Sequence, residues 1–215
     1  MDLLKEFVDL FLHLDRHLSE LIARYGTSTY AILFLIIFCE TGLVVTPFLP
    51  GDSLLFAAGT FAGMGVLDLR LLFPLLFAGA VVGDSTNYWI GRYVGPRAFT
   101  GTVRFLKREY VDRTRAFYAR HGRKTVILAR FLPILRTFAP FVAGVGEMPY
   151  KKFLWMSLIG SLAWVGLFVG TGYFFGNLPV VRDHFSLVVM GIIAVSLLPM
   201  AVEVFKGWLS SRGKA

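Results

Sequence analysis

The chain has 215 residues, of which 56% are apolar and 17% charged, against roughly 45–50% and 25% in an average soluble domain. This composition excludes an ordinary water-soluble globule and predicts an all-α integral membrane protein that crosses the bilayer several times. The formal charge of +8 belongs to residues 92–124 alone, because the basic and acidic residues elsewhere balance.

Residues 1–27 predict an amphipathic N-terminal helix. Leucine and aromatic side chains recur there at steps of three and four, with carboxylates between them. That spacing is typical of one apolar helical face, which would lie on the membrane surface or pack on the rest of the protein. The carboxylates argue against a signal peptide, which begins with basic residues.

Four apolar runs come close to the roughly 20 residues that a spanning helix needs. They are residues 29–46, 71–91, 153–176 and 185–205. Two further apolar stretches, about 47–66 and 125–146, are interrupted by proline, glycine or charge. Interrupted stretches of this length predict re-entrant helical hairpins, which enter and leave the membrane on one side. Amphipathic surface helices are the alternative for both.

The basic segment 92–124 sets the expected orientation. Short loops rich in lysine and arginine stay in the cytoplasm, so we expect this segment to form an amphipathic helix on the inner surface rather than a nucleic-acid site. Four spans then place both termini in the cytoplasm, which agrees with the basic residues of the tail 207–215. The first hairpin would enter from outside and the second from inside.

A weak internal repeat supports two opposed copies. The sequence Phe61-Ala-Gly-Met-Gly65 has a later counterpart in Val142-Ala-Gly-Val-Gly146. At the same offset, Gly91-x-x-x-Gly95 precedes Gly172-x-x-x-Gly176. An odd number of crossings between the copies would invert one relative to the other, as in many secondary transporters.

Five charged residues fall inside the predicted membrane region: Glu40, Asp52, Asp84, Arg130 and Arg136. An isolated charge at a helix centre costs roughly 2.5–3.5 kcal/mol, so we expect the three acids and two arginines to meet. One carboxylate would lack a guanidinium, and burial would favour its protonated form. The arginines suit a phosphate because their planar fork binds oxyanions with two hydrogen bonds. The alternative is a purely structural ion-pair lattice.

Other chemistry has little support in the sequence. Four scattered histidines and one cysteine do not suggest a metal site or an intramembrane hydrolase. No phosphate-binding Gly-x-x-x-x-Gly-Lys-[Ser/Thr] motif occurs, so any pumping would use an ion gradient. We expect neither enzymatic activity nor a cofactor or metal.

The motifs around the buried charges resemble those of the DedA family of bacterial inner-membrane proteins. The segment Glu40-Thr-Gly-Leu-Val-Val-Thr-Pro47-Phe-Leu-Pro50-Gly51-Asp52 is similar to the first family signature. The second is Arg130-Phe-Leu-Pro133-Ile-Leu-Arg136-Thr137-Phe-Ala-Pro140-Phe-Val-Ala-Gly144, and Gly83-Asp84 to Gly91-Arg92 resembles the family's span between them.

The resemblance implies one membrane domain over residues 28–206, related to eukaryotic lipid scramblases. It also implies return of undecaprenyl phosphate, a polyprenyl-phosphate lipid carrier, across the inner membrane. By motif position, the resemblance ties Glu40, Asp52, Arg130 and Arg136 to activity and proton coupling. We expect substrate binding by Arg130, Arg136 and Thr137, and proton coupling or ion pairing by Glu40, Asp52 and Asp84. The structural motif positions would be Pro47, Pro50, Gly51, Pro133, Pro140 and Gly144.

Three functions therefore remain open. The first is a flippase for undecaprenyl phosphate that is linked to the proton gradient. The second is a proton-coupled exporter or antiporter of small cations or drugs, and the third is a non-transporting factor for membrane homeostasis or assembly. The Gly-x-x-x-Gly patterns also permit close contacts between helices of one chain or of a homo-oligomer.

Overall fold

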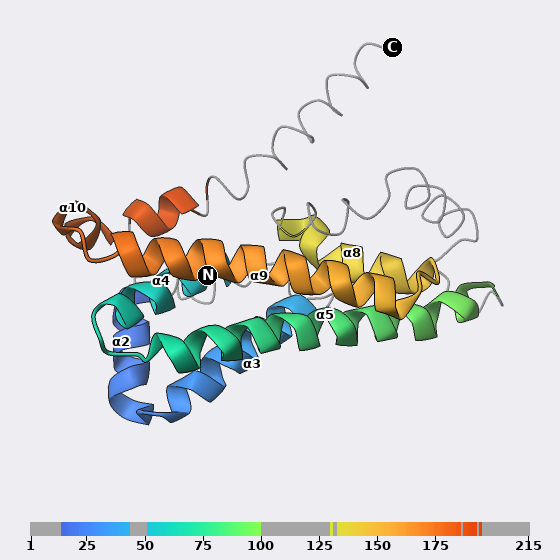
Figure 1. The fold of residues 1–215 in the computed structure, drawn as a ribbon, viewed down its shortest axis with the longest axis horizontal. Coiled ribbons are helices and arrows are strands. Elements are labelled where there is room, and N and C mark those ends of the chain that lie inside the picture. The colour runs from blue at the N-terminus through green and yellow to red at the C-terminus, as the bar shows by residue number, and fades with distance from the viewer. Residues whose placement is uncertain are drawn as a thin grey trace, which may run out of the picture.

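The computed structural model describes residues 14–43, 51–99, 130, 133–185, 187–192 and 194, and the regular structure in these ranges is entirely helical. Two long helices, α5 (Leu69–Phe99) and α9 (Tyr150–Phe175), lie side by side (Figure 1). Shorter helices surround them: α2 (Leu14–Tyr25), α3 (Ser28–Gly42), α4 (Gly51–Gly63), α8 (Pro133–Val145) and α10 (Pro179–Asp183). The all-α expectation is confirmed for this part of the chain.

Helices α5 and α9 are long and apolar enough to cross a membrane. Each contains an apolar stretch of 26 residues, 69–94 in α5 and 150–175 in α9. A span needs roughly 20. The two helices run in opposite directions (Figure 1), and Tyr88 in the second half of α5 stacks on Phe153 near the start of α9, with ring centroids 4.7 Å apart. The expected spans 71–91 and 153–176 thus correspond to these two helices, while most of 185–205 lies outside the described residues.

Helix α3 covers most of the span expected at 29–46, of which residues 44–46 lie outside the described residues. It has 15 residues and ends at Gly42, where Leu43 takes an extended conformation. At 1.5 Å per residue its length is about 22 Å, short of the roughly 30 Å hydrocarbon core. It starts beside the start of α5, where the backbone N–H of Asp68 donates to the Tyr30 hydroxyl at 2.7 Å. Its last residue packs on Gly83, midway along α5.

Helix α4 returns toward the end from which α3 came. Its first residue lies beside the end of α3, because the backbone N–H of Gly51 donates to the Glu40 carboxylate at 3.2 Å. Its last residue, Gly63, packs against the backbone of Tyr173, near the end of α9. The end of α9 lies beside the start of α5. Helix α3 therefore runs from that end to the middle of the two long helices, and α4 runs back to the same end.

The glycines of the predicted repeat make equivalent contacts. A Cβ atom at Gly63 would lie 2.6 Å from the carbonyl oxygen of Tyr173, and one at Gly144 would lie 2.7 Å from the backbone nitrogen of Arg92. The offset of the repeat relates Gly63 to Gly144 and Arg92 to Tyr173. Helix α4 therefore packs on α9 as α8 packs on α5, and because α5 and α9 are antiparallel, α4 and α8 approach from opposite ends.

A second pair of glycine contacts has the same relation. A Cβ atom at Gly172 would lie 3.0 Å from the backbone nitrogen of Thr60, and one at Gly91 would lie 3.0 Å from the Cα atom of Phe141. The same offset relates Gly91 to Gly172 and Thr60 to Phe141. The short sequence repeat thus coincides with two matching helix contacts.

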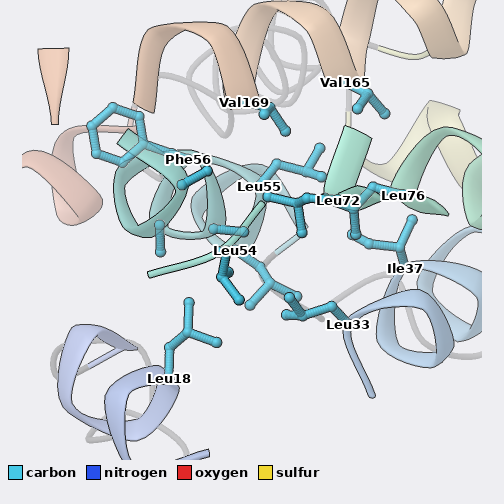
Figure 2. Close-up of a cluster of buried hydrophobic side chains, with 14 of the residues drawn as sticks. Leu18, Leu33, Ile37, Leu54, Leu55, Phe56, Leu72, Leu76, Val165 and Val169 are labelled. Atoms are coloured by element: carbon cyan, nitrogen blue, oxygen red, sulfur yellow. The ribbon is translucent and has the colours of Figure 1, made fainter. Parts of the chain in front are cut away.

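The apolar core surrounds α4 at the end where α5 begins. Figure 2 shows side chains from α2, α3, α5 and α9 converging on Leu54, Leu55 and Phe56 of α4. Ten of the 13 residues of α4 are buried, so α4 is not the surface helix that the sequence also allowed. Leu18 of α2 is 1% exposed in the same core, which shows that the described part of the N-terminal helix packs on the protein.

Several sequence expectations fall outside the described residues. These are the residues before 14, the basic segment beyond residue 99, and the tail 207–215. The motif prolines Pro47 and Pro50 also lie outside them.

Candidate functional site

The structure brings the five predicted charges together at the middle of α5 and α9. Glu40 lies in the last turn of α3, Asp52 in the first turn of α4 and Asp84 midway along α5. Arg130 precedes α8 and Arg136 lies in its first turn. Of the five, Asp52 has the most exposed side chain, at 13%. We call these residues the charged cluster.

Arg136 bridges two carboxylates. Its Nη1 donates to Asp52 Oδ1 at 2.7 Å, and its Nη2 donates to Glu40 Oε1. The backbone N–H of Gly51 donates to the same Glu40 oxygen. One guanidinium thereby fastens α8 to the junction between α3 and α4, so that the opposed helices are joined by charge.

Arg130 makes the second ion pair. Its Nη1 donates to Asp84 Oδ2, and the hydroxyl of Ser157 on α9 donates to that oxygen at 2.6 Å. The sequence predicted that one carboxylate would lack a guanidinium. In the structure all three carboxylates have one, because Glu40 and Asp52 share Arg136. The cluster nevertheless holds three acids and two arginines, so its formal charge is still −1 when all five groups are ionised.

Trp164 of α9 is a member of the site that sequence reasoning missed. Its indole N–H donates to Asp52 Oδ1 at 2.8 Å. The ring centroid lies 5.3 Å from Cζ of Arg130 and 4.6 Å from Cζ of Arg136, within the range of cation–π attraction. Its spacing after Ser157 and Ser161 was the available signal, because steps of four and three place all three on one face of α9.

Several buried polar atoms of the site make no hydrogen bond with described residues. They are Glu40 Oε2, Asp84 Oδ1, Asn87 Oδ1, Arg130 Nε and Nη2, Arg136 Nε and Ser161 Oγ. Each such atom costs about 1–3 kcal/mol in a folded protein, so a gathering of them calls for a functional explanation. The two atoms of Arg130 are adjacent donors of one guanidinium, a geometry that suits two oxygens of one oxyanion.

Asn87 connects the helices that meet at the site. Its side-chain amide donates to the carbonyl oxygen of Thr41 on α3 at 3.1 Å and to that of Thr137 on α8 at 2.7 Å. Thr137 is fully buried. The structure thus gives Thr137 a backbone role in holding α8, while a direct role of its hydroxyl in substrate binding stays a prediction.

The other motif positions shape the backbone around the charged cluster. A Cβ atom at Gly51 would collide with the Glu40 carboxylate, and one at Gly144 would collide with the backbone of α5. Pro133 begins α8, where its missing N–H costs nothing, and Pro140 lies inside the same helix. Among the described residues, no three His, Cys, Asp or Glu side chains are placed to hold a metal ion.

Replacing Trp164 with phenylalanine tests the indole N–H. We expect Trp164→Phe to lower the free energy of unfolding by about 1.5–3 kcal/mol, the usual contribution of a hydrogen bond to a charged group, and Trp164→Leu to lower it further by removing the ring from both guanidiniums. Trp155→Phe is the matched control, because Trp155 of the same helix is 68% exposed. Thermal unfolding of the purified variants measures the difference, and equal stability of Trp164→Phe and Trp155→Phe would contradict the assignment.

Known proteins resemble the chain over nearly its whole length. Residues 49–174 match the VTT domain family. "Protein DedA" of Escherichia coli K12 is 53% identical over 96% of this chain and 95% of its own length. An uncharacterized membrane protein of Mycobacterium leprae is 45% identical over 86% and 84%, and "Inner membrane protein YghB" of Escherichia coli K12 is 33% identical over 72% and 71%. No solved structure matches the chain.

Proposed function

This chain belongs to the VTT domain family of membrane proteins, together with Protein DedA, and from that premise we propose that it is a flippase for a polyprenyl phosphate. Its cargo would be undecaprenyl phosphate, returned across the bacterial inner membrane with the help of the proton gradient. The phosphate would bind in the charged cluster while the lipid tail stays in the bilayer.

The pair of orphaned donors on Arg130 is the observation that carries this proposal. Arg130 is 4% exposed, and its Nε and Nη2 have no partner in the described part of the chain. A phosphate offers the acceptor oxygens that this edge needs. A carboxylate of a soluble substrate would satisfy the same edge, but the site lies at mid-height of two helices that are long and apolar enough to cross a membrane, a position that favours a lipid cargo.

The opposed arrangement of α4 and α8 supports alternating access. We propose that α3 with α4, and the segment that ends in α8, are re-entrant hairpins that meet at the membrane midplane. Broken helices at that depth are the usual site of cargo binding in inverted-repeat transporters. Breaking the Arg136 contacts with Glu40 and Asp52 would separate the hairpins, and re-forming them would close the path.

A proton would act at Glu40. The fully ionised cluster carries a formal charge of −1, and Glu40 Oε2 has no hydrogen-bond partner among the described residues. Protonating Glu40 would neutralise the cluster and weaken its pairing with Arg136. Arg136 would then be available to the phosphate, so proton uptake and phosphate binding would favour each other.

The orientation follows from the basic segment and from the path of α3. Cytoplasmic placement of residues 92–124 puts the end of α5 inside. Because α3 and α4 enter and leave beside the start of α5, the same rule places α2 at the outer end. The expectation of a cytoplasmic N-terminal helix depended on a complete crossing at 29–46, and we propose the outer placement instead because the 15 residues of α3 are fewer than the roughly 20 that a crossing needs.

Arg130→Lys tests the phosphate edge. Lysine keeps the charge that pairs with Asp84 but cannot present two adjacent donors in a plane, so we expect about a tenfold loss of translocation, equivalent to roughly 1.4 kcal/mol. The assay is transfer of undecaprenyl phosphate between leaflets of vesicles that contain the purified protein.

Arg70→Lys is the control for this test, because Arg70 is exposed at the start of α5. Transport by Arg130→Lys at the rate of Arg70→Lys would remove the support for an oxyanion clamp at this residue.

The net charge of the cluster favours a second candidate, a proton-coupled antiporter of small cations. Three carboxylates against two guanidiniums would attract a cation, with the arginines only holding the acids in place. Ion flux through the protein in vesicles without any polyprenyl lipid would support this alternative. Flux that is absent there, with lipid translocation present, would favour the flippase.

A further inference from the structure

A cavity of about 520 Å³ lies away from the charged cluster, between α2, α4 and the residues that follow α9. Its volume is within the range of small-molecule sites. The lining residues are Arg16, Ser19, Glu20, Thr60, Phe61, Met64, Gly176 and Phe185. None of them belongs to the charged cluster, so the cavity needs its own explanation.

One wall of the cavity carries a pair of opposite charges. Arg16 and Glu20 are one helical turn apart on α2, and both are exposed. In the described part of the chain neither forms a salt bridge. A purely anionic ligand would be repelled by Glu20 and a purely cationic one by Arg16. The pair therefore favours a ligand that itself carries both charges a few ångströms apart.

The facing wall is largely apolar. Phe61 is half-buried and Met64 is 39% exposed, both on the α4 side, and Phe185 is buried against Phe56, with ring centroids 6.0 Å apart. A small soluble zwitterion would gain nothing from these side chains. An amphiphile would place its apolar part on them while its head group lies on α2.

The position of the cavity agrees with a lipid ligand. Gly176 directly follows the last residue of α9, and one turn earlier the Thr60 hydroxyl donates to the carbonyl oxygen of Gly172 at 3.3 Å. The cavity thus lies at the end of a spanning helix, the level at which head groups meet the hydrocarbon core. Figure 1 shows α2 at this end, away from the last turns of α5.

We propose that the cavity binds the head group of a zwitterionic phospholipid. The phosphate lies on Arg16, the ammonium lies on Glu20, and the glycerol and first acyl carbons lie on Phe61 and Met64. The bound lipid stabilises the contact between α2 and α4. This site is independent of the proposed transport, since it involves no residue of the charged cluster.

Lipid binding to the purified full-length protein in mild detergent tests the proposal. Native mass spectrometry would titrate phosphatidylethanolamine and, separately, phosphatidylglycerol. We expect tighter binding of phosphatidylethanolamine, and about a tenfold loss of that affinity in Arg16→Gln and in Glu20→Gln, as for removal of one hydrogen bond to a charged group. Arg24→Gln is the matched control on α2, because Arg24 lies outside the cavity lining.

Three outcomes would overturn the proposal. Equal binding of both lipids, with dependence on Arg16 but not Glu20, would indicate a site for anionic head groups. Equal displacement by soluble glycerophosphoethanolamine and by the lipid would indicate a soluble ligand. Unchanged lipid affinity in both variants would mean that the cavity takes no lipid. Because the charged cluster is intact in these variants, none of these outcomes bears on polyprenyl-phosphate transport.

Discussion

Replacing Arg136 with glutamine is expected to abolish transport and to lower the free energy of unfolding by about 3–5 kcal/mol, the usual effect of removing one partner of a buried ion pair. Arg136 is 4% exposed and bridges Glu40 and Asp52. Its loss leaves the buried Glu40 and the partly buried Asp52 without their shared cation. Thermal unfolding and lipid translocation would be measured on the same preparation, with Arg70→Gln as the exposed control.

A double variant separates stability from transport. Glu40→Gln combined with Arg136→Gln restores the formal charge of the cluster to −1 and removes one uncompensated carboxylate. We expect it to regain part of the lost stability and none of the transport. Full transport by this double variant would contradict the proposed role of both residues in transport and would favour a purely structural role for their ion pair.

Replacing Gly172 with alanine is expected to have the second largest effect. A Cβ atom there would collide with the backbone of α4, including the Phe56 carbonyl and the Thr60 nitrogen. Backbone atoms cannot rotate away as a side chain can, so we expect a loss of about 3 kcal/mol, the upper end of the usual overpacking cost. Gly91→Ala should behave alike, because its Cβ would meet the backbone of Phe141 in α8.

Two other glycines of α9 provide matched controls. A Cβ atom at Gly166 or Gly170 would meet nothing within 4 Å, so Gly166→Ala and Gly170→Ala should leave stability unchanged or slightly raise it through helix propensity. Thermal unfolding of the four alanine variants gives the comparison. A similar loss in all four would mean that the close packing of α4 on α9 is not what makes Gly172 necessary.

The sequence was sufficient to predict that the charges meet, and insufficient to predict how. Two segments broken by proline carry opposite charges, and the chain must bury both in the membrane. Few arrangements of these segments avoid leaving a charge isolated there. Arg136 pairs with two carboxylates because of how the side chains of α3, α4 and α8 are placed in space. The spacing of residues along the chain does not contain that information. Trp164 was missed for a related reason, since a tryptophan within an apolar run looks the same whether it faces lipid or an arginine.

Within the span expected at 29–46 the structure describes a helix that ends at Gly42, because hydrophobicity reports where a helix can lie and not where it must end. The apolar run continues past Gly42, but α3 stops there and Tyr30 places its start beside Asp68. That contact joins residues far apart in the chain, so no local pattern contains it. The internal repeat was the better guide, because it encodes glycine contacts that the structure repeats.

The most direct test of the phosphate clamp is a cryo-electron microscopy structure of the protein with undecaprenyl phosphate in a lipid nanodisc. We expect density for a head group within hydrogen-bond distance of Arg130 Nε and Nη2, with the tail leading out between helices into the bilayer. A charged cluster that keeps all its ion pairs while the lipid head group binds elsewhere on the protein would contradict this account.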